Sequence, residues 1–178
     1  MTARKTRLHA RRSRPLGEVE GSTVRAVAID LQPLLLFRRS RVESGWIDPE
    51  GQRLTDLLNR QEALRLLLAG EEGEPADWVS CRVGELLLVA PPPRPTDPSR
   101  WLPRRRRRVG LRVGPYRVVG TAHMPPETEV EDFIAQRRQR FLPLTQCRVI
   151  MRDAEYAPDV AIVNIAHVHE VEHLITIP

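Results

Sequence analysis

The sequence predicts a β-rich α+β fold made of two tandem small barrel-like units that pack as a pseudo-symmetric pair. Three observations support this prediction. The chain carries one spacing of apolar residues twice, most of its apolar segments alternate with polar residues, and a segment rich in proline and arginine separates the two copies. With 178 residues, two small units could bury together the sheet faces that neither covers well alone.

The two copies become visible when residues 35–69 are laid on residues 111–145 and residues 78–89 on residues 160–171. Apolar side chains recur at the same positions in both alignments, and one insertion separates the alignments. Chance agreement is the alternative, because apolar spacings recur in unrelated domains. The repeated order of the apolar residues favours an internal duplication.

Alternation predicts the strands of the second copy. Val109, Leu111 and Val113 alternate with their neighbours before a turn at residues 114–115. Alternation resumes over residues 118–124, as in a half-buried hairpin. Further strands are expected at Thr145–Met151, Val160–Ile165 and Val168–Ile177. Each unit is therefore expected to contain a hairpin followed by two or three more strands.

A short helix is expected after each hairpin, in the second copy from about residue 129 to residue 139. Thr128 and Glu131 have the spacing of a capping box. Apolar residues at i, i+3 and i+4 give each helix one apolar stripe. The stripe consists of Leu54, Leu57 and Leu58 in the first copy and of Val130, Phe133 and Ile134 in the second.

These elements set the expected boundaries. Residues 1–21 form a basic disordered tail, residues 22–92 the first unit, residues 93–108 a linker rich in proline and arginine, and residues 109–178 the second unit. The alternation of residues 23–31 predicts an extra strand that leads into the first unit. Prolines exclude both helix and central strand from the linker, which is expected to be extended.

Composition predicts a cytoplasmic protein. No apolar segment approaches the roughly 20 residues that a membrane-spanning helix needs, and no apolar segment of a signal peptide follows the basic start. The cysteines Cys81 and Cys147 are too few for a disulfide scaffold and lack the spacing of a structural zinc site. We interpret them as buried thiols in a reducing compartment.

The positive charge lies in two segments. Residues 1–16 carry a charge of +6 and residues 94–112 a charge of +7, although the whole chain carries only +5, so the rest of the chain is acidic. Such segments could neutralise the phosphates of a nucleic acid, or they could be solvated tail and linker. The candidate nucleic-acid-binding residues are Arg11, Arg12, Arg14, Trp101, Arg104, Arg105, Arg106, Arg107 and Arg108.

The second copy contains the segments RVVGTAHMP, DFI, FLPLT and VAIVNIAHVHEVE. With these segments it resembles a group of small uncharacterised bacterial domains. The resemblance covers residues 109–173 and, weakly, residues 34–90, where Ser44 takes the place of the glycine. It implies no activity. More distantly, the hairpin and closing strands are similar to an Sm-like small β-barrel, which implies RNA binding and ring assembly, although no base-stacking aromatic residue supports this.

A cluster of histidines near the C-terminus suggests a metal site. On a regular strand, His167, His169 and His173 would share one face, and His123 is a possible fourth ligand. Parallel side chains on one strand stand about 7 Å apart, however, so they would reach a common ion only if the strand bends. The alternative is a set of surface or hydrogen-bonded histidines.

Motifs of catalysis and of cofactor binding are missing from the sequence. We find no nucleophile elbow, no phosphate-binding or dinucleotide-binding glycine motif and no HExxH, and therefore expect no cofactor. Asp56 and Asp132 occupy the first turns of the two expected helices, where the helix dipole stabilises a carboxylate. We interpret both as structural.

Three functions remain, in this order. The first is a non-enzymatic binding or regulatory module that acts through protein interaction, with a protein partner or by self-association, on a surface between the copies. The alternative is a nucleic-acid-associated protein that uses the basic tail and the arginine-rich linker. The third is a metal-dependent enzyme that uses the C-terminal histidines.

Overall fold

The computed structural model describes residues 30–70, 73–93, 105–136, 139–152 and 154–173. The expected tail, most of the expected extra strand and most of the expected linker lie outside the described residues. So do Arg11, Arg12, Arg14, Trp101 and Arg104, and the side chain of His173. None of the helices in the described part is long and apolar enough to cross a membrane.

The first half contains five strands, one α-helix and one 3-10 helix. Their bounds are β1 Gln32–Phe37, β2 Val42–Ile47, α1 Leu54–Arg60, β3 Ala63–Ala69, β4 Pro75–Arg82, η1 Val83–Glu85 and β5 Leu88–Ala90. The second half repeats this order and adds one short strand. Its bounds are β6 Arg105–Val113, β7 Tyr116–Met124, α2 Val130–Gln136, β8 Phe141–Met151, β9 Ala154–Tyr156, β10 Val160–Asn164, η3 Ile165–His167 and β11 Val168–His173.

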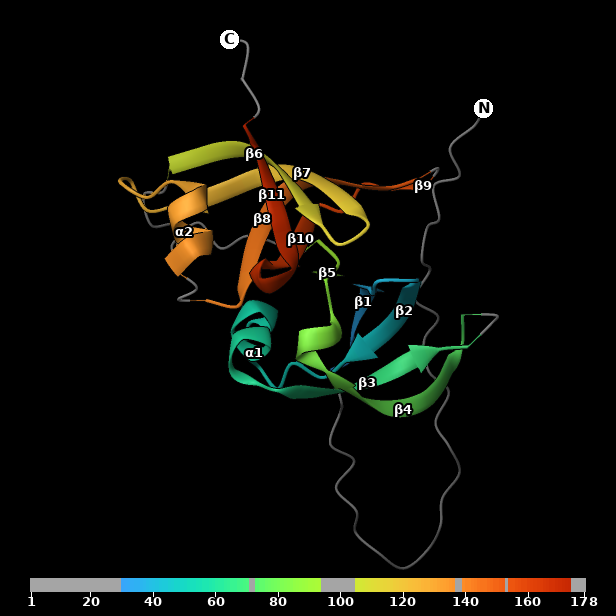
Figure 1. Cartoon of the computed structure of the whole chain (residues 1–178). Helices are drawn as coiled ribbons and strands as arrows, with labels where there is room; N and C mark the ends of the chain where they lie inside the picture. The colour runs from blue at the N-terminus through green and yellow to red at the C-terminus, as the bar shows by residue number, and fades with distance from the viewer. Residues whose placement is uncertain (1–29, 71–72, 94–104, 137–138, 153, 174–178) are drawn as a thin grey trace, which may run out of the picture.

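All the described strands belong to one antiparallel sheet. Their order is β11-β6-β7-β8-β10-β5-β1-β2-β3-β4, with β9 paired to β8 beside this path. Among the described residues the path does not close, because no pairing joins β4 to β11. A β-rich α+β fold is therefore confirmed. The sheet bends back on itself, so the second half lies above the first in Figure 1 and β5 passes between them.

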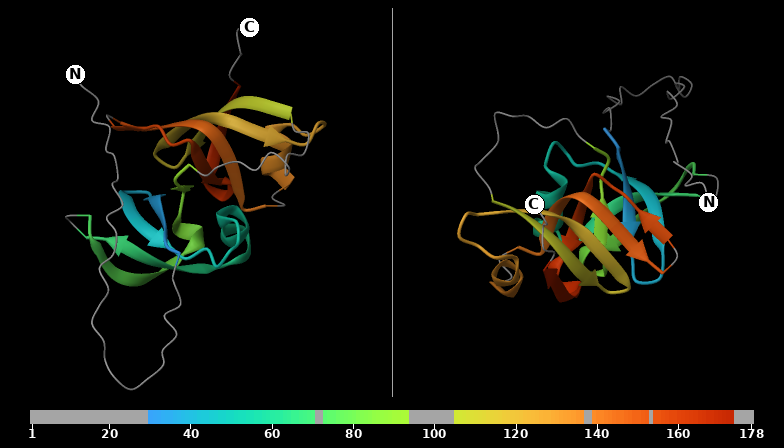
Figure 2. Two further views of the ribbon diagram at one scale, coloured as in Figure 1. Left: turned by 180° about the vertical axis from the view of Figure 1, so that it is seen from behind. Right: turned by 90° about the horizontal axis from the view of Figure 1, so that it is seen from above.

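Both halves have the same strand neighbours. The first half has the order β5-β1-β2-β3-β4 and the second half the order β11-β6-β7-β8-β10. In each half, the α-helix connects the second strand to the third, and a 3-10 helix precedes the last strand. The view from behind shows the two halves as separate layers, each with its own helix (Figure 2). The expected repeat therefore extends to the pairing of the strands.

Paired residues show which positions of the two halves correspond. Val89 of β5 lies opposite Leu36 of β1, and Val171 of β11 lies opposite Leu111 of β6. All four side chains are at least half-buried and alternate with residues that face the other way. Leu36 therefore corresponds to Leu111, and the rest of each hairpin follows from this pair.

Leu36 pairs with Glu43 of β2, and Leu111 pairs with Val118 of β7. Two residues further along each strand, Gly45 of β2 therefore corresponds to Gly120 of β7. The alignment of Ser44 with this glycine is therefore wrong by one residue. The structure gives the physical reason for a glycine at both positions. A Cβ atom on Gly45 would lie 2.9 Å from the Leu67 carbonyl oxygen, and one on Gly120 would lie 2.9 Å from Leu144 Cβ.

Two boundaries differ from the sequence prediction. Strand β6 begins at Arg105, so Arg105–Arg108 belong to the second half and not to the linker. Each of these residues pairs with a residue of β7, from Arg105 opposite Met124 to Arg108 opposite Thr121. Strand β8 begins at Phe141, earlier than the expected Thr145. In both cases strand pairing with distant residues supplies the stabilisation that local sequence lacks.

Each half contributes side chains to the core of the other. Phe37, Leu87, Leu88 and Ala90 of the first half are buried in the cluster that fills the second half. Phe141 and Ile162 of the second half are buried in the cluster that fills the first half. The halves therefore share their cores through the junction of β5 with β10, where Ile162 pairs with Val89 and Val163 with Leu88.

Hydrogen bonds satisfy the polar groups buried at this junction. The side chain of Asn164 is 1% exposed; its Nδ2 donates to the Leu86 carbonyl oxygen at 2.9 Å, and its Oδ1 accepts from the Ala166 backbone N–H at 3.1 Å. The Tyr116 hydroxyl donates to the Arg38 carbonyl oxygen at 2.6 Å.

On the other side of the junction, Asn59 Oδ1 accepts from the backbone N–H groups of Arg140 and Phe141, at 2.7 and 2.9 Å. The Arg140 side chain in turn donates to Glu62 Oε1 at 2.5 Å. These contacts join the end of α1 to the start of β8. Side chains of the two halves thus fill the surface between them.

Replacing Asn164 by alanine should destabilise the whole chain. The change leaves the Leu86 carbonyl oxygen and the Ala166 N–H without these partners, at a cost of about 2–3 kcal/mol in the free energy of unfolding. Urea denaturation followed by circular dichroism measures this cost. The control Gln136→Ala, at an exposed position of α2, should change the free energy by less than about 0.5 kcal/mol. An equal effect of both changes would contradict the prediction.

Candidate functional site

The histidines do not form the expected row. His167 lies in the 3-10 helix and not on a strand, because the side chain of Asn164 caps the Ala166 N–H and begins that helix. An irregularity between Val168 and Glu170 then shifts the pairing of β11 with β6. The expectation that His167 and His169 share one strand face is therefore wrong.

Two of the histidines have polar partners in the protein. His167 Nε2 lies 2.8 Å from the Gly84 carbonyl oxygen of the first half, and His123 Nε2 lies 2.8 Å from Thr145 Oγ1. His169 is exposed. Among the described residues, no three His, Cys, Asp or Glu side chains are grouped so that they could hold a metal ion.

The arginines of β6 lie against acidic residues of the same half. Arg107 Nη2 lies 2.7 Å and Arg105 Nη1 3.8 Å from Glu129 Oε1, in the loop before α2. Arg108 Nη1 donates to the Gln146 carbonyl oxygen at 2.9 Å. Arg106 on the same strand is exposed. Part of the charge that could neutralise phosphates is thus used within the protein.

A second ionic cluster lies at the pairing of β6 with β11. Glu172 accepts from Arg112 Nε at 3.0 Å and from Arg117 Nη2 at 2.6 Å, and Glu170 lies 3.9 Å from Arg112. The hydrogen bond from Arg117 holds the pKa of the Glu172 carboxyl below its usual range, and Arg112 adds to this effect. Arg112 and Glu170 are exposed, and Arg117 and Glu172 are partly exposed, so water and salt reach the cluster and screen the attraction.

The two thiols are buried and protonated. Burial raises the pKa of Cys147 to about 11. Burial also raises the pKa of Cys81, although Arg38 Nη2 lies 3.2 Å from its sulfur and opposes this effect. A thiolate is the nucleophilic form of cysteine, so neither side chain is suited to nucleophilic catalysis.

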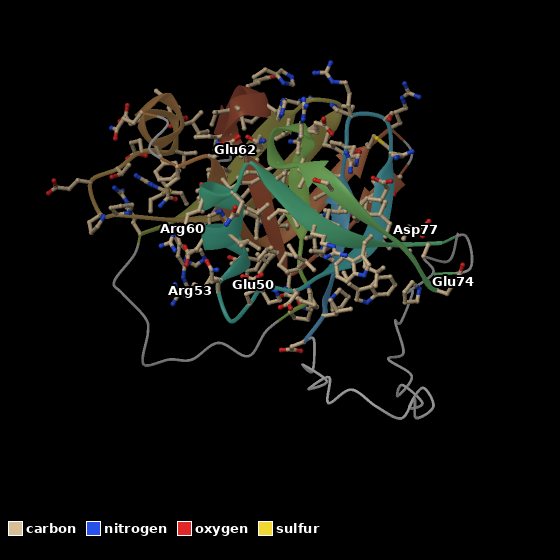
Figure 3. The ribbon with its side chains drawn as sticks, turned by 90° about the horizontal axis from the view of Figure 1, so that it is seen from below. Glu50, Arg53, Arg60, Glu62, Glu74 and Asp77 are labelled. Atoms are coloured by element: carbon tan, nitrogen blue, oxygen red, sulfur yellow. The ribbon has the colours of Figure 1, made fainter. Side chains whose placement is uncertain are left out.

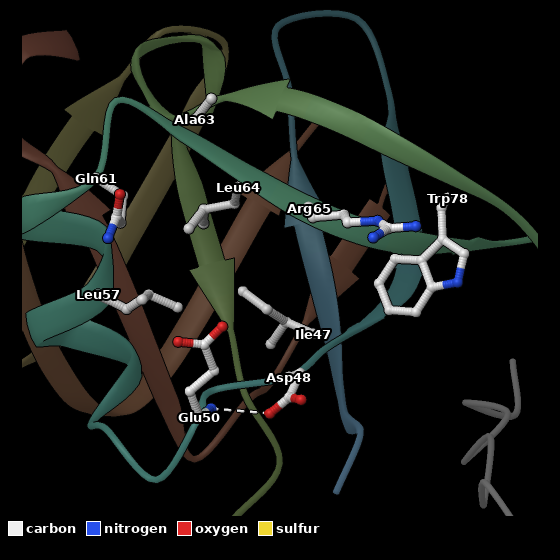
Figure 4. A pocket seen from close by; sticks show the side chains of 9 residues that line it. All are labelled: Ile47, Asp48, Glu50, Leu57, Gln61, Ala63, Leu64, Arg65 and Trp78. Carbon is white, nitrogen blue, oxygen red and sulfur yellow. Dashed lines mark hydrogen bonds between the residues drawn. The ribbon is translucent and has the colours of Figure 1, made fainter. Parts of the chain in front are cut away.

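A pocket of about 440 Å³ opens on the outer surface of the first half (Figure 4). Apolar side chains form its floor, and acidic side chains lie on one side of its mouth. The lining residues are Ile47, Asp48, Glu50, Leu57, Gln61, Ala63, Leu64, Arg65 and Trp78. A pocket of this size is in the range of small-ligand and side-chain binding sites.

A turn after β2 places the acidic residues of the pocket. Asp48 Oδ1 accepts from the Glu50 N–H at 2.8 Å, as Figure 4 shows, and Gln52 N–H donates to the Pro49 carbonyl oxygen. Glu50 has a φ of 49°, in the left-handed region that favours glycine. The turn sets both acidic residues beside the apolar floor.

Trp78 stands at the rim of the pocket. It is 39% exposed and is the most prominent exposed apolar side chain of the described residues. The Arg65 guanidinium lies 4.8 Å from the centre of its ring, a cation–π contact across β3 and β4. Figure 3 shows charged residues around this surface: Glu50, Arg53, Arg60 and Glu62 lie in or near α1, and Glu74 and Asp77 lie just before or on β4.

The sequence analysis did not identify this pocket. One signal could have placed Trp78 outside: Trp78, Ser80 and Arg82 alternate with Val79 and Cys81. Every second side chain of a strand faces the same side, and the side with mainly polar residues normally faces solvent. Trp78 lies on that side. The remaining lining residues come from β2, α1 and β3, and only the fold brings them to Trp78.

Comparison with protein-family models, with curated proteins and with solved structures found no match for this chain.

Both thiols should resist labelling in the folded protein. At pH 8 a thiol of pKa about 11 is almost entirely protonated, and burial excludes the reagent as well. Ellman's reagent should label both cysteines rapidly in urea and neither in buffer. The variant Cys81→Ser reports on Cys147 alone. A fast-reacting thiol in the native protein would show that one site is accessible and ionised.

Removing the acidic partners should strengthen binding of polyanions. Replacing Glu129 and Glu172 by glutamine releases the arginines of β6 and β7, so affinity for a labelled oligonucleotide should rise and should fall steeply between about 50 and 200 mM salt. Fluorescence anisotropy measures both effects. A control with Glu50→Gln and Glu74→Gln makes the same change in net charge elsewhere. Equal gains for the two variants would show that the arrangement of the arginines does not matter.

Proposed function

We propose that this protein is a non-enzymatic protein-interaction module that binds its partner at the pocket beside Trp78. The observation that carries the proposal is the exposure of Trp78 at the rim of an open pocket lined by both apolar and charged side chains. Tryptophan is the residue type most enriched among side chains that dominate protein-binding energy. Such side chains typically insert beside well-packed apolar surface, and this one lies next to Leu64 and Ile47.

The lining of the pocket favours a lysine or arginine side chain of the partner. Its floor of Ile47, Leu57 and Leu64 suits an aliphatic stem. Asp48 and Glu50 would then meet the cationic end at the mouth. Arg65 already lies over Trp78, so a second cation fits better on the acidic side of the pocket. The partner would therefore present a basic residue within a segment that also contacts the indole.

Two observations favour protein interaction over the other functions. His167 lies in the 3-10 helix with its Nε2 near the Gly84 carbonyl oxygen, and His123 lies near Thr145, which argues against a metal site built from these histidines. The ion pairs of Arg105 and Arg107 with Glu129 reduce the charge that this strand can offer to a nucleic acid.

We also infer that the two halves are diverged copies of one small barrel-like unit, packed as a pseudo-symmetric pair. The identical order of strands, the matched positions of α1 and α2 and the corresponding glycines Gly45 and Gly120 support this inference. The surface between the copies is filled by their own side chains. The pocket on the outer surface therefore replaces it as the proposed binding site.

Photo-crosslinking in cells tests the proposed function. A photoreactive residue at Gln61, which lines the pocket, should give a covalent adduct with a protein, and Trp78→Ala should remove that adduct. Trp78→Ala should lower stability by less than about 1 kcal/mol, because the ring is partly exposed and its cation–π contact is weak at a surface. Mass spectrometry identifies what is attached.

The same photoreactive residue at Gln136, exposed on α2, is the matched control and should give no such adduct. Equal adducts at both positions, an adduct that survives Trp78→Ala, or attachment to nucleic acid alone would each contradict the proposal.

A further inference from the structure

Each of the two strands that meet at the junction between the halves has a corresponding strand at an end of the sheet. Strand β10 corresponds to β4, and β5 corresponds to β11, since each pair holds the same place in the two orders. Within the chain, β10 pairs with β5. The corresponding strands β4 and β11 are the two ends of the described path. Strand β4 of one chain could therefore pair with β11 of a second copy, as β10 pairs with β5 within the chain.

The side chains that cross the internal junction are apolar. Phe37, Leu88 and Ala90 of β1 and β5 are buried in the core of the second half. Phe141 and Ile162 of β8 and β10 are buried in the core of the first half. Removing these side chains from water stabilises the contact between the halves.

Strand pairing identifies the counterparts of the first set. Leu88 lies opposite Phe37, and Glu170 lies opposite Arg112. By the same correspondence, Glu172 takes the place of Ala90. All three apolar positions of the internal junction therefore carry charged residues at the end formed by β11.

These charged residues are satisfied where they are. Arg112 binds Glu172 and lies near Glu170, and Arg117 binds Glu172 as well. The side chains of Glu170 and Arg112 are 58% and 47% exposed. Suppose that β11 paired with β4 of a second chain as β5 pairs with β10 within this chain. Glu170 would then enter the core of the second chain, as Leu88 enters the core of the second half. Burying an unpaired carboxylate is strongly unfavourable.

The opposite end of the sheet lacks the matching apolar side chains. Strands β3 and β4 of the first half correspond to β8 and β10 of the second. Ser80 of β4 pairs with Arg65 of β3, and Ile162 of β10 pairs with Pro143 of β8, so Ser80 takes the place of Ile162. Ala63 pairs with Arg82, as Phe141 pairs with Asn164, so Ala63 takes the place of Phe141. Both replacements are exposed and small. This end therefore lacks the counterparts of Ile162 and Phe141, and Trp78, in the place of Val160, is the large apolar side chain that remains there.

We propose that these replacements restrict the sheet to two units, so that the chain does not add a second copy of itself at either end. The backbone of β4 and β11 is suited to strand addition, as any sheet edge is. Charged side chains in the places of Phe37, Leu88 and Ala90 at one end, and small ones in the places of Ile162 and Phe141 at the other, remove most of the apolar contact that holds the internal junction together, although Trp78 remains on β4. The inference concerns strand pairing at the sheet ends and not the binding of another protein in the pocket, although the β4 end shares Ala63 and Trp78 with the pocket lining.

Restoring the internal side chains at the two ends tests the proposal. One chain receives Arg112→Phe, Glu170→Leu and Glu172→Ala, and another receives Ala63→Phe and Ser80→Ile. Light scattering after size exclusion, at about 100 µM, should give the mass of a monomer for the unmodified chain. An equimolar mixture of the two variants should form a heterodimer at least ten-fold more tightly than either variant associates with itself.

A control mixture separates specific pairing from general stickiness. In it, the β11 changes are replaced by Glu127→Ala and Gln136→Leu, at exposed positions away from both ends. This mixture should stay monomeric. If the triple variant does not fold, as judged by circular dichroism, Glu170→Leu alone is mixed with the β4 variant and should still dimerise.

Three results would overturn the proposal: folded variants that stay monomeric when mixed, a control mixture that dimerises equally well, or an unmodified chain that already associates and becomes monomeric when Ser80 is changed to proline. Proline removes a backbone donor from the free edge of β4. The crosslink at Gln61 can succeed or fail whatever the outcome here, so the two proposals are tested separately.

Discussion

The pairing of β5 with β10 is the contact on which the rest of the structure depends. It joins only two described residue pairs, yet neighbouring residues of β5 enter different cores: Val89 that of the first half and Leu88 that of the second. Ile162 of β10 lies in the core of the first half. Because each half completes the core of the other, neither half would keep a filled core by itself.

The shared junction explains where polar groups and binding surfaces lie. Asn59, Asn164 and Tyr116 bind backbone groups of the opposite half, so that the interface contains few unsatisfied polar atoms. Such an interface has no room for a partner. Binding is then left to the outer surfaces, and the outer surface of β3 and β4 combines a pocket of mixed apolar and charged lining with an exposed tryptophan.

The two halves share one topology but differ in surface chemistry. Glycine recurs at Gly45 and Gly120, where a side chain would collide with a neighbouring strand. By contrast, Trp78 and Val160 hold corresponding places, and only the tryptophan is exposed on an outer surface. The two halves carry the same residue at these sterically constrained positions and different residues at this surface position.

The sequence by itself determined the local elements. Alternation and apolar stripes predicted the hairpin of β6 and β7 and both helices, because these features depend on neighbouring residues. Only the tertiary structure decided what lies next to each element. Glu129 turns the arginines of β6 into ion-pair partners, the Leu86 carbonyl oxygen holds the side chain of Asn164, and β2, α1 and β3, with the turns between them, bring their side chains to Trp78. These contacts join residues far apart in the chain, and no local pattern encodes such a distance.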